Sequence, residues 1–266
     1  KSQKTTPQFN NNDCLTGITF EGGARIVGGK KLSGFKEDTF NGHRCFSLFI
    51  PEVKEGKWVF TDLYVNGIRA KLTRYPEKGT LRCIDTENNT GGQFTSSKWF
   101  IAYKEDLENI TNIEDAIVSY YHFWIDEHSP VESYDRETGK LIMKYRSRYL
   151  ITNRYDEPNN CANLYYYLEN IPEMFKEPDN WYLDRKSGML YYIPRDDTWT
   201  PEDLVVYAPT VDRIVDICGS EEFAVSDIRF RNLQFVCSKG DYASVGCNVD
   251  ASFIEGETYG ADPQSV

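Results

Sequence analysis

The chain has 266 residues, of which 40% are apolar and 14% aromatic, so it has enough apolar side chains for a folded core and is not a disordered segment. Its 30 Lys and Arg residues against 41 Asp and Glu residues give a net charge of −11, which disfavours nucleic acid and polyanionic polysaccharides as partners and suits a neutral ligand. No apolar run approaches the roughly 20 residues of a membrane span.

The seven cysteines are scattered along the chain and are never spaced as CxxC. This pattern favours buried free thiols in a reducing compartment over a zinc site or a disulfide framework. Together with the lack of a signal-peptide pattern, it favours the cytoplasm over secretion. We therefore expect neither a metal nor another cofactor.

Short strands separated by glycine corners open the chain. Residues 17–27 (GITFEGGARIV) predict a strand, a Gly-Gly corner and a second strand, and Gly28-Gly29 predicts another corner. This pattern is typical of one turn of a coiled β architecture, which we expect to cover residues 14–35.

An antiparallel pattern begins near residue 36. Asn66-Gly67 predicts a two-residue hairpin turn. Residues 104–115 are the best helical candidate, with capping-box spacing from Thr111 to Glu114. Residues 116–125 form the most apolar run and predict one buried strand. Further strands are expected at 45–50, 58–65 and 99–103.

Two hairpins with the same turn sequence follow. Asp135 to Gly139 (DRETG) and Asp184 to Gly188 (DRKSG) share the form DRx[ST]G, in which Asp accepts hydrogen bonds from the turn backbone and Gly takes a positive φ. The single carboxylate of the shared motif is too few for an EF-hand calcium loop. Between the hairpins, residues 163–175 predict a short helix.

From residue 204 short β-rich runs return, separated by small or polar corners. The predicted organisation is therefore a first coil turn at 14–35, an inserted antiparallel β subdomain at 36–203, and a return to coil turns at 204–266, where the coil is cut short.

Five segments carry a family likeness in a fixed order. They are GARIVGGKKLSGF (23–35), LYVNGIRAKLTRYP (63–76), YHFWIDEHSPVESYD (121–135), YYYLENIPEMFKEPDNWYLDRKSGMLYYIP (165–194) and FAVSDIRFRNLQF (223–235). Together they resemble the N-terminal portion of bacterial right-handed parallel β-helix glycoside hydrolases of the β-xylosidase, xylanase and α-L-fucosidase type. The resemblance implies a mainly β fold, in which the start of a right-handed parallel β-helix carries an inserted antiparallel barrel-like or sandwich-like subdomain with short helices.

The same resemblance implies a parent protein that hydrolyses O-glycosyl bonds in plant or host glycans. In such enzymes the catalytic acids lie on later coil turns, so the catalytic carboxylates are expected beyond residue 266 and this chain alone is expected to be inactive. The partners expected are an oligosaccharide or polysaccharide, and either the rest of the parent β-helix or a second copy that caps the open coil. Two other classes stay open: a non-catalytic carbohydrate-binding or adhesin module, and a polysaccharide lyase, which the acidic balance disfavours.

The candidate sugar-contacting residues fall in two places. If residues 116–125 are one strand, His122, Trp124 and Asp126 share a face, where they could stack on a sugar and hydrogen-bond its hydroxyl groups. The alternatives are a Trp packed at a seam, with His and Asp closing buried hydrogen bonds, and metal binding by the two histidines of this segment. Arg74 and Tyr75 are expected to line a cleft near the subdomain boundary, the alternative being a solvated arginine.

Overall fold

The computed structural model describes residues 8–9, 19–122, 125–158, 160–211, 213–220, 224–238 and 247–250. Over these residues the chain is mainly β with a few short helices, and most strand pairs are antiparallel. The chain divides into two compact units, one made of residues 1–34, 58–70 and 203–239 and the other of residues 35–57, 71–202 and 240–266. Within the part described, no helix is both long enough and apolar enough to cross a membrane.

The first unit contains a four-stranded antiparallel sheet. Its strands, in order, are β4 (Gly29–Leu32), β19 (Val206–Pro209), β7 (Tyr64–Val65) and β8 (Ile68–Arg69). The predicted hairpin turn is confirmed, because Asn66 and Gly67 have φ angles of 51° and 80° and join β7 to β8. The strand expected at 58–65 is wrong over most of its length, since only Tyr64 and Val65 find ladder partners on β19 and the Trp58 indole N–H donates to the Pro209 carbonyl at 3.0 Å.

Three parallel pairs complete the first unit. They are β1 (Gln8–Phe9) with β20 (Asp216–Ile217), β2 (Thr19–Glu21) with β21 (Arg229–Arg231), and β3 (Arg25–Val27) with β22 (Gln234–Val236). Residues 19–27 and 229–236 therefore run side by side in the same direction, and the paired Phe20 and Phe230 stack with ring centroids 5.3 Å apart. Gly28 lies at the corner that follows, where a Cβ would meet the Cys237 carbonyl at 3.0 Å.

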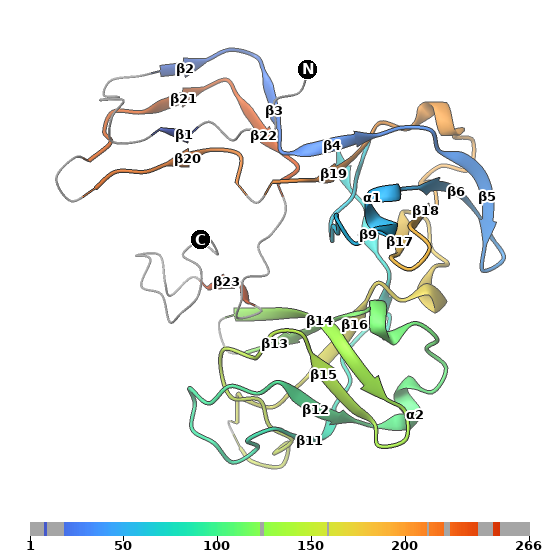
Figure 1. Ribbon diagram of the computed structural model, residues 1–266, viewed down its shortest axis with the longest axis vertical. Helices are drawn as coiled ribbons and strands as arrows, with labels where there is room; N and C mark the ends of the chain where they lie inside the picture. Colours follow the sequence, from blue (N-terminus) through green and yellow to red (C-terminus); the bar gives the residue numbers. More distant parts are fainter. Residues whose placement is uncertain are drawn as a thin grey trace. The chain divides into compact units, whose positions relative to one another are not determined.

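The second unit contains an eight-stranded sheet (Figure 1). Its central strand is β14 (Ile125–Asp135), which pairs with β13 (Ile117–Tyr121) through its first half and with β15 (Lys140–Met143) through its second. The core on one side of the sheet includes the fully buried Phe100, Tyr120 and Tyr166. The other strands are β10 (Arg74–Tyr75), β16 (Tyr166–Glu169), β12 (Trp99–Ala102), β11 (Cys83–Thr86) and β23 (Cys247–Asp250), which pairs with β14.

A five-stranded sheet forms the rest of this unit. Its order is β5 (Lys36–Phe40), β6 (His43–Phe49), β18 (Met189–Tyr192), β17 (Asn180–Asp184) and β9 (Lys71–Leu72). Buried Asn170 links the two sheets, because its Nδ2 donates to the carbonyls of Asp115 and Leu183 at 3.1 and 2.9 Å and its Oδ1 accepts from the Leu183 N–H at 2.9 Å. Such a side chain, satisfied on both ends inside the protein, fixes one arrangement of its neighbours.

The helices are shorter than the sequence predicts. Residues 104–115 do not form one helix, because Thr111 gives both its N–H and its hydroxyl to Glu173, at 3.0 and 2.6 Å, so the capping box with Glu114 does not form. The helix expected over 163–175 is also wrong, since residues 166–169 pair as β16 with β13 and only residues 172–174 are helical, as η2. The helical segments described are α1 (Pro51–Lys54), α2 (Lys104–Leu107), η1 (Ile113–Asp115), η2 (Pro172–Met174) and η3 (Pro201–Asp203).

Residues 116–125 are not one strand either. The chain reverses after Tyr121, so that Tyr121 pairs with Asp126 across the β13–β14 hairpin. His122 and Asp126 therefore do not lie along one strand, and Trp124 lies outside the described residues. The run is apolar because β13 is buried along most of its length, and apolarity alone does not reveal where a buried segment turns.

Candidate functional site

The outer face of four strands of the eight-stranded sheet gathers polar and aromatic side chains. Alternation along β13 and β16 directs Val118, Tyr120, Tyr166 and Leu168 into the core. The residues between them lie on the opposite face, together with their cross-strand neighbours on β10 and β14. We call this set the polar face: Arg74, Ser119, Tyr121, Asp126, His128, Tyr167 and Glu169.

Hydrogen bonds join His128 to both carboxylates of the polar face. The Ser119 hydroxyl donates to Glu169 Oε2 at 2.5 Å and lies 2.7 Å from His128 Nδ1, while His128 Nε2 is 2.9 Å from Asp126 Oδ2. Because the one Ser119 proton goes to Glu169, its oxygen accepts from Nδ1–H, and Nε2–H donates to the Asp126 carboxylate. Both ring nitrogens of His128 then carry protons, so the side chain is an imidazolium.

The electrostatics agree with this proton assignment. Burial alone would lower the pKa of His128, but its hydrogen bonds and charge attraction to Asp126 and Glu169 outweigh burial and raise the pKa to about 9. The hydrogen bond from His128 in turn holds the pKa of Asp126 below its ordinary value. At neutral pH the cluster is therefore one cation between two carboxylates.

This trio does not act as a nucleophilic Ser–His–Asp triad. Ser119 is fully buried and its proton points to Glu169. The protonated His128 cannot take a proton as a general base. These hydrogen bonds stabilise the polar face and fix its charges. The function that the polar face can support is therefore binding of a ligand.

The accessible part of the polar face combines an aromatic ring with a carboxylate. Tyr121 is 46% exposed and the Asp126 side chain 40% exposed. The Tyr121 ring lies 5.8 Å from Tyr167, and the Arg74 guanidinium lies 4.1 Å from the Tyr167 ring centroid. Arg74 is also fixed by donating to the carbonyls of two residues that follow it, Glu77 and Gly79, at 3.0 and 2.7 Å. An exposed ring beside a hydrogen-bonding carboxylate suits the C–H face and hydroxyl groups of a sugar.

The structure brings together two of the residues singled out from the sequence. Arg74 and Asp126 both lie on the polar face. Tyr75 points to the opposite side of the sheet, where its hydroxyl donates to the Asp106 carbonyl at 2.8 Å. His122 is buried, with Nε2 2.5 Å from Glu127 Oε1 and its ring edge-on to Tyr120.

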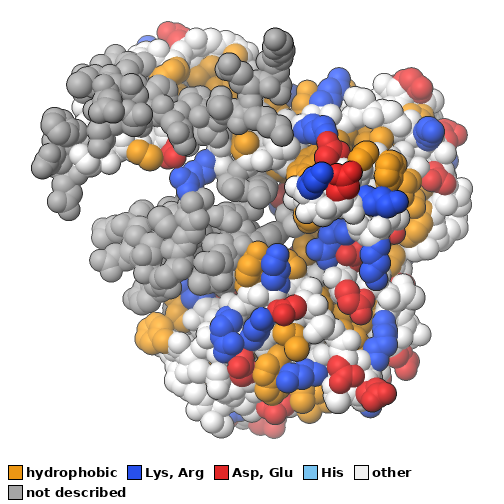
Figure 2. Space-filling model, in the orientation of Figure 1, with side chains coloured by type: hydrophobic (Ala, Val, Ile, Leu, Met, Phe, Trp, Pro, Cys, Tyr) orange, Lys and Arg blue, Asp and Glu red, His pale blue; other side chains and the backbone are white. Residues whose placement is uncertain are grey.

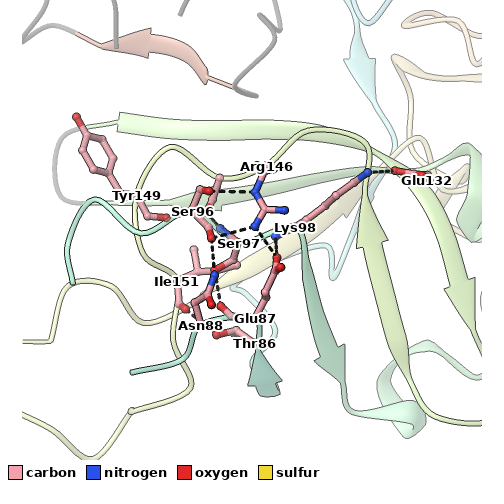
Figure 3. Close-up of polar contacts among 11 residues, drawn as sticks. Thr86, Glu87, Asn88, Ser96, Ser97, Lys98, Glu132, Arg146, Tyr149 and Ile151 are labelled. Atoms are coloured by element: carbon pink, nitrogen blue, oxygen red, sulfur yellow. Dashed lines mark hydrogen bonds and ion pairs between the residues drawn. The ribbon is translucent and has the colours of Figure 1, made fainter. Parts of the chain in front are cut away.

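Hydrogen bonds from neighbouring segments hold Glu127 of the buried His122–Glu127 pair. Glu127 also accepts from the backbone N–H of Arg148 at 2.8 and 3.1 Å. The segment around Arg148 is held by the loop at 86–98, because Arg146 donates to Glu87 at 3.0 Å and to Ser96 Oγ, also at 3.0 Å (Figure 3). The His122 ring therefore lies beside the core residue Tyr120, on the side of the sheet opposite the polar face.

Sequence reasoning missed five members of the polar face: Ser119, Tyr121, His128, Tyr167 and Glu169. The signal for two of them was present. Residues 164–169 (LYYYLE) alternate, with Leu164, Tyr166 and Leu168 inward, and three consecutive tyrosines favour a strand over a helix.

The part of the chain that the structure describes gives little support for a metal site or a disulfide. No group of three or more His, Cys, Asp or Glu side chains there is placed to hold a metal ion. Five described cysteines are free thiols: Cys45, Cys83, Cys161, Cys218 and Cys237. On the face shown in Figure 2, basic and acidic side chains lie interspersed on the described surface.

Comparison with known proteins gives one informative likeness. No protein-family model matches the chain, and no curated protein sequence matches it either. A solved structure described as a glycoside hydrolase matches 90% of this chain with a TM-score of 0.64 and 18% sequence identity. The chain spans 42% of the length of that structure's chain. At this identity the likeness shows a shared fold, a mainly β architecture that a glycoside hydrolase also uses.

Proposed function

We propose that the chain is part of a carbohydrate-active protein of the glycoside hydrolase class and that its polar face contacts a neutral glycan. The observation that carries the proposal is the fold likeness to a glycoside hydrolase over 90% of the chain. Since one fold hosts many functions, the chemistry of the site must support the same conclusion. The exposed Tyr121 ring beside the Asp126 carboxylate, on an acidic chain that does not attract polyanions, provides that support.

The proposal includes the architecture of the first unit. Its three parallel strand pairs are those that stacked turns of a right-handed parallel β-helix would make, with residues 19–27 and 229–236 on successive turns. In this interpretation residues 14–35 begin the β-helix, residues 36–203 contain the inserted subdomain and residues 204–266 return to it.

The proposal also assigns binding, and not bond cleavage, to the polar face. Glycoside hydrolysis uses a carboxylic acid to protonate the leaving group and a second carboxylate as base or nucleophile. Asp126 accepts a hydrogen bond from the His128 imidazolium, which favours its ionised form, and Glu169 accepts a hydrogen bond from the Ser119 hydroxyl. Neither is set up as a proton donor, so the proposal gives this pair of carboxylates no catalytic role.

Binding of neutral xylo-oligosaccharides of four or more sugars tests the proposal. Replacing Tyr121 by Ala removes the exposed ring, and we expect the affinity to fall at least tenfold, about 1.4 kcal/mol. Phe49→Ala is the matched control, because Phe49 is 48% exposed in the same unit and lies on a different sheet. Equal affinities for the two variants, with folding intact by circular dichroism, would remove the polar face as the glycan site.

A further inference from the structure

A concave site lies in the same compact unit and shares no residue with the polar face. It is a pocket of about 600 Å³, within the range of small-molecule sites. Four separate stretches of chain form it: the end of β5, residues 111–112, η2, and β17 with its turn. We call it the β17 pocket; its lining residues are Phe40, Asn41, Thr111, Asn112, Pro172, Glu173, Tyr182, Asp184 and Lys186.

Contacts across the β17 pocket hold its polar side chains in place. Asn41 Nδ2 donates to the Pro172 carbonyl at 2.7 Å. Asn112 Nδ2 donates to the Tyr182 hydroxyl at 2.8 Å. Glu173 Oε1 accepts both hydrogen bonds from Thr111. A ligand therefore meets groups that are already ordered, which reduces the entropy lost on binding.

The atoms left over are mostly hydrogen-bond acceptors. Within the described residues, Asn41 Oδ1, Asn112 Oδ1 and Glu173 Oε2 have no hydrogen-bond partner. Asp184 Oδ1 accepts hydrogen bonds from the backbone N–H groups of its own turn. Asp184 Oδ2 likewise has no hydrogen-bond partner within the described residues. A ligand that complements these atoms brings several donors, as a polyhydroxyl compound does.

The charges of the lining and an apolar wall limit the chemical class of the ligand further. Two carboxylates against the single lysine of the lining disfavour an anion, and the Lys186 ammonium disfavours a polycation. Phe40 supplies the apolar wall, and its ring is held by stacking on Tyr191 with centroids 4.1 Å apart. We propose that the β17 pocket binds a neutral mono- or disaccharide, with the spare acceptors taking its hydroxyl protons and Phe40 covering its C–H face. This site stands on its own lining and does not require the glycan site on the polar face.

The two DRx[ST]G turns provide a matched pair of variants. Lys186 lines the pocket, and Glu137 holds the same position in the other turn, away from it. Thr111→Trp gives a stronger test, because Thr111 is exposed at the pocket wall and an indole there fills the space. All variants are made in the Tyr121→Ala background, which removes binding at the polar face.

Calorimetric titration with xylobiose and cellobiose gives the readout, with glucuronic acid and spermidine as charged comparators. We expect saturable binding of a neutral disaccharide that Thr111→Trp weakens at least tenfold, that Lys186→Ala weakens about threefold and that Glu137→Ala leaves unchanged. The absence of disaccharide binding in the Tyr121→Ala background would overturn the proposal, as would equal affinity in the Thr111→Trp variant or tighter binding of either charged comparator. Disaccharide binding in the pocket would leave this proposal standing even if Tyr121→Ala left the affinity for longer xylo-oligosaccharides unchanged in the Thr111→Trp chain, a result that would count against the glycan proposal alone.

Discussion

The β14–β15 and β17–β18 hairpins have the same turn chemistry and serve different sites. In both turns the Gly N–H donates to the Asp carbonyl at 2.8 Å, and Gly139 and Gly188 have φ angles of 76° and 78°. The first hairpin carries Asp126 and His128 far from its turn, on the long strand β14. The second places its own turn residues, Asp184 and Lys186, in the β17 pocket. A shared turn sequence therefore predicts local geometry, and the strands around it decide what the hairpin does.

The two turn arginines differ in the same way. Both reach the segment at 110–115, where Arg136 donates to the Ile110 carbonyl at 2.7 Å. Arg185 makes an ion pair with the buried Asp115, its Nε 2.7 Å from Asp115 Oδ1. The β17–β18 hairpin thus contacts this segment through an ion pair with a buried carboxylate. The β14–β15 hairpin contacts it through hydrogen bonds to backbone carbonyls.

The largest effect that separates the hairpins is expected from removal of these arginines. Arg185→Ala leaves the Asp115 carboxylate buried without its cation, which costs about 3 to 5 kcal/mol of unfolding free energy. Arg136→Ala removes hydrogen bonds to the Ile110 and Thr111 carbonyls, at 2.7 and 3.5 Å, and costs about 1 kcal/mol. Urea denaturation of the two variants measures the difference. Equal losses would show that Asp115 is not held mainly by Arg185.

The second effect concerns pH and belongs to the first hairpin. The pKa of His128 in the folded chain, about 9, lies above its ordinary value of 6.5, so the stabilisation is full below pH 6.5 and is lost as pH rises through 9. The loss is on the order of 3 kcal/mol. The lowered pKa of Asp126 affects stability at acidic pH. Its contribution to the unfolding free energy is lost as pH falls below 3.8.

Unfolding free energies measured between pH 6 and 10 check this expectation. The wild type should lose stability across the range, and His128→Gln should start lower and lose much less. A profile that falls equally steeply in both proteins would contradict the imidazolium assignment.

The smallest difference is expected between the two turn glycines. A Cβ at Gly139 would meet the Ala102 carbonyl at 2.7 Å, and one at Gly188 would meet the Ile50 carbonyl at 2.9 Å. Both positions also have positive φ, so each Gly→Ala change should cost about 1 to 3 kcal/mol, with little difference between them. Thermal unfolding of the pair measures this, and a large difference would mean that the turns are less alike than their hydrogen bonds indicate.

The sequence predicted local turns better than long strands or sites. Asn66-Gly67 and both DRx[ST]G turns are encoded by neighbouring residues, and the structure forms them as predicted. The reversal between Tyr121 and Asp126 was missed because β13 is buried and carries no polar period. The sequence predicts a helix over the strand Tyr166–Glu169 because its Leu, Tyr and Glu residues suit both structures, and pairing with β13 decides between them.

The candidate site could be predicted only in part, for the same reason. Arg74 and Asp126 could be proposed from residue type, but their neighbours on the polar face come from strands far apart in sequence. Ser119, His128 and Glu169 meet only because β13 lies between β14 and β16. No local pattern contains that register.

The central claim is that the polar face binds a neutral glycan without cleaving it. Calorimetric titration of xylo-oligosaccharides into the chain carrying Thr111→Trp tests this most directly, because the β17 pocket is then filled and because binding gives a finite heat whereas turnover gives a continuous one. We expect a saturable heat that is lost on adding Tyr121→Ala and kept on adding Phe49→Ala. Continuous heat release with sugar products, or a saturable heat that Tyr121→Ala leaves unchanged, would contradict it.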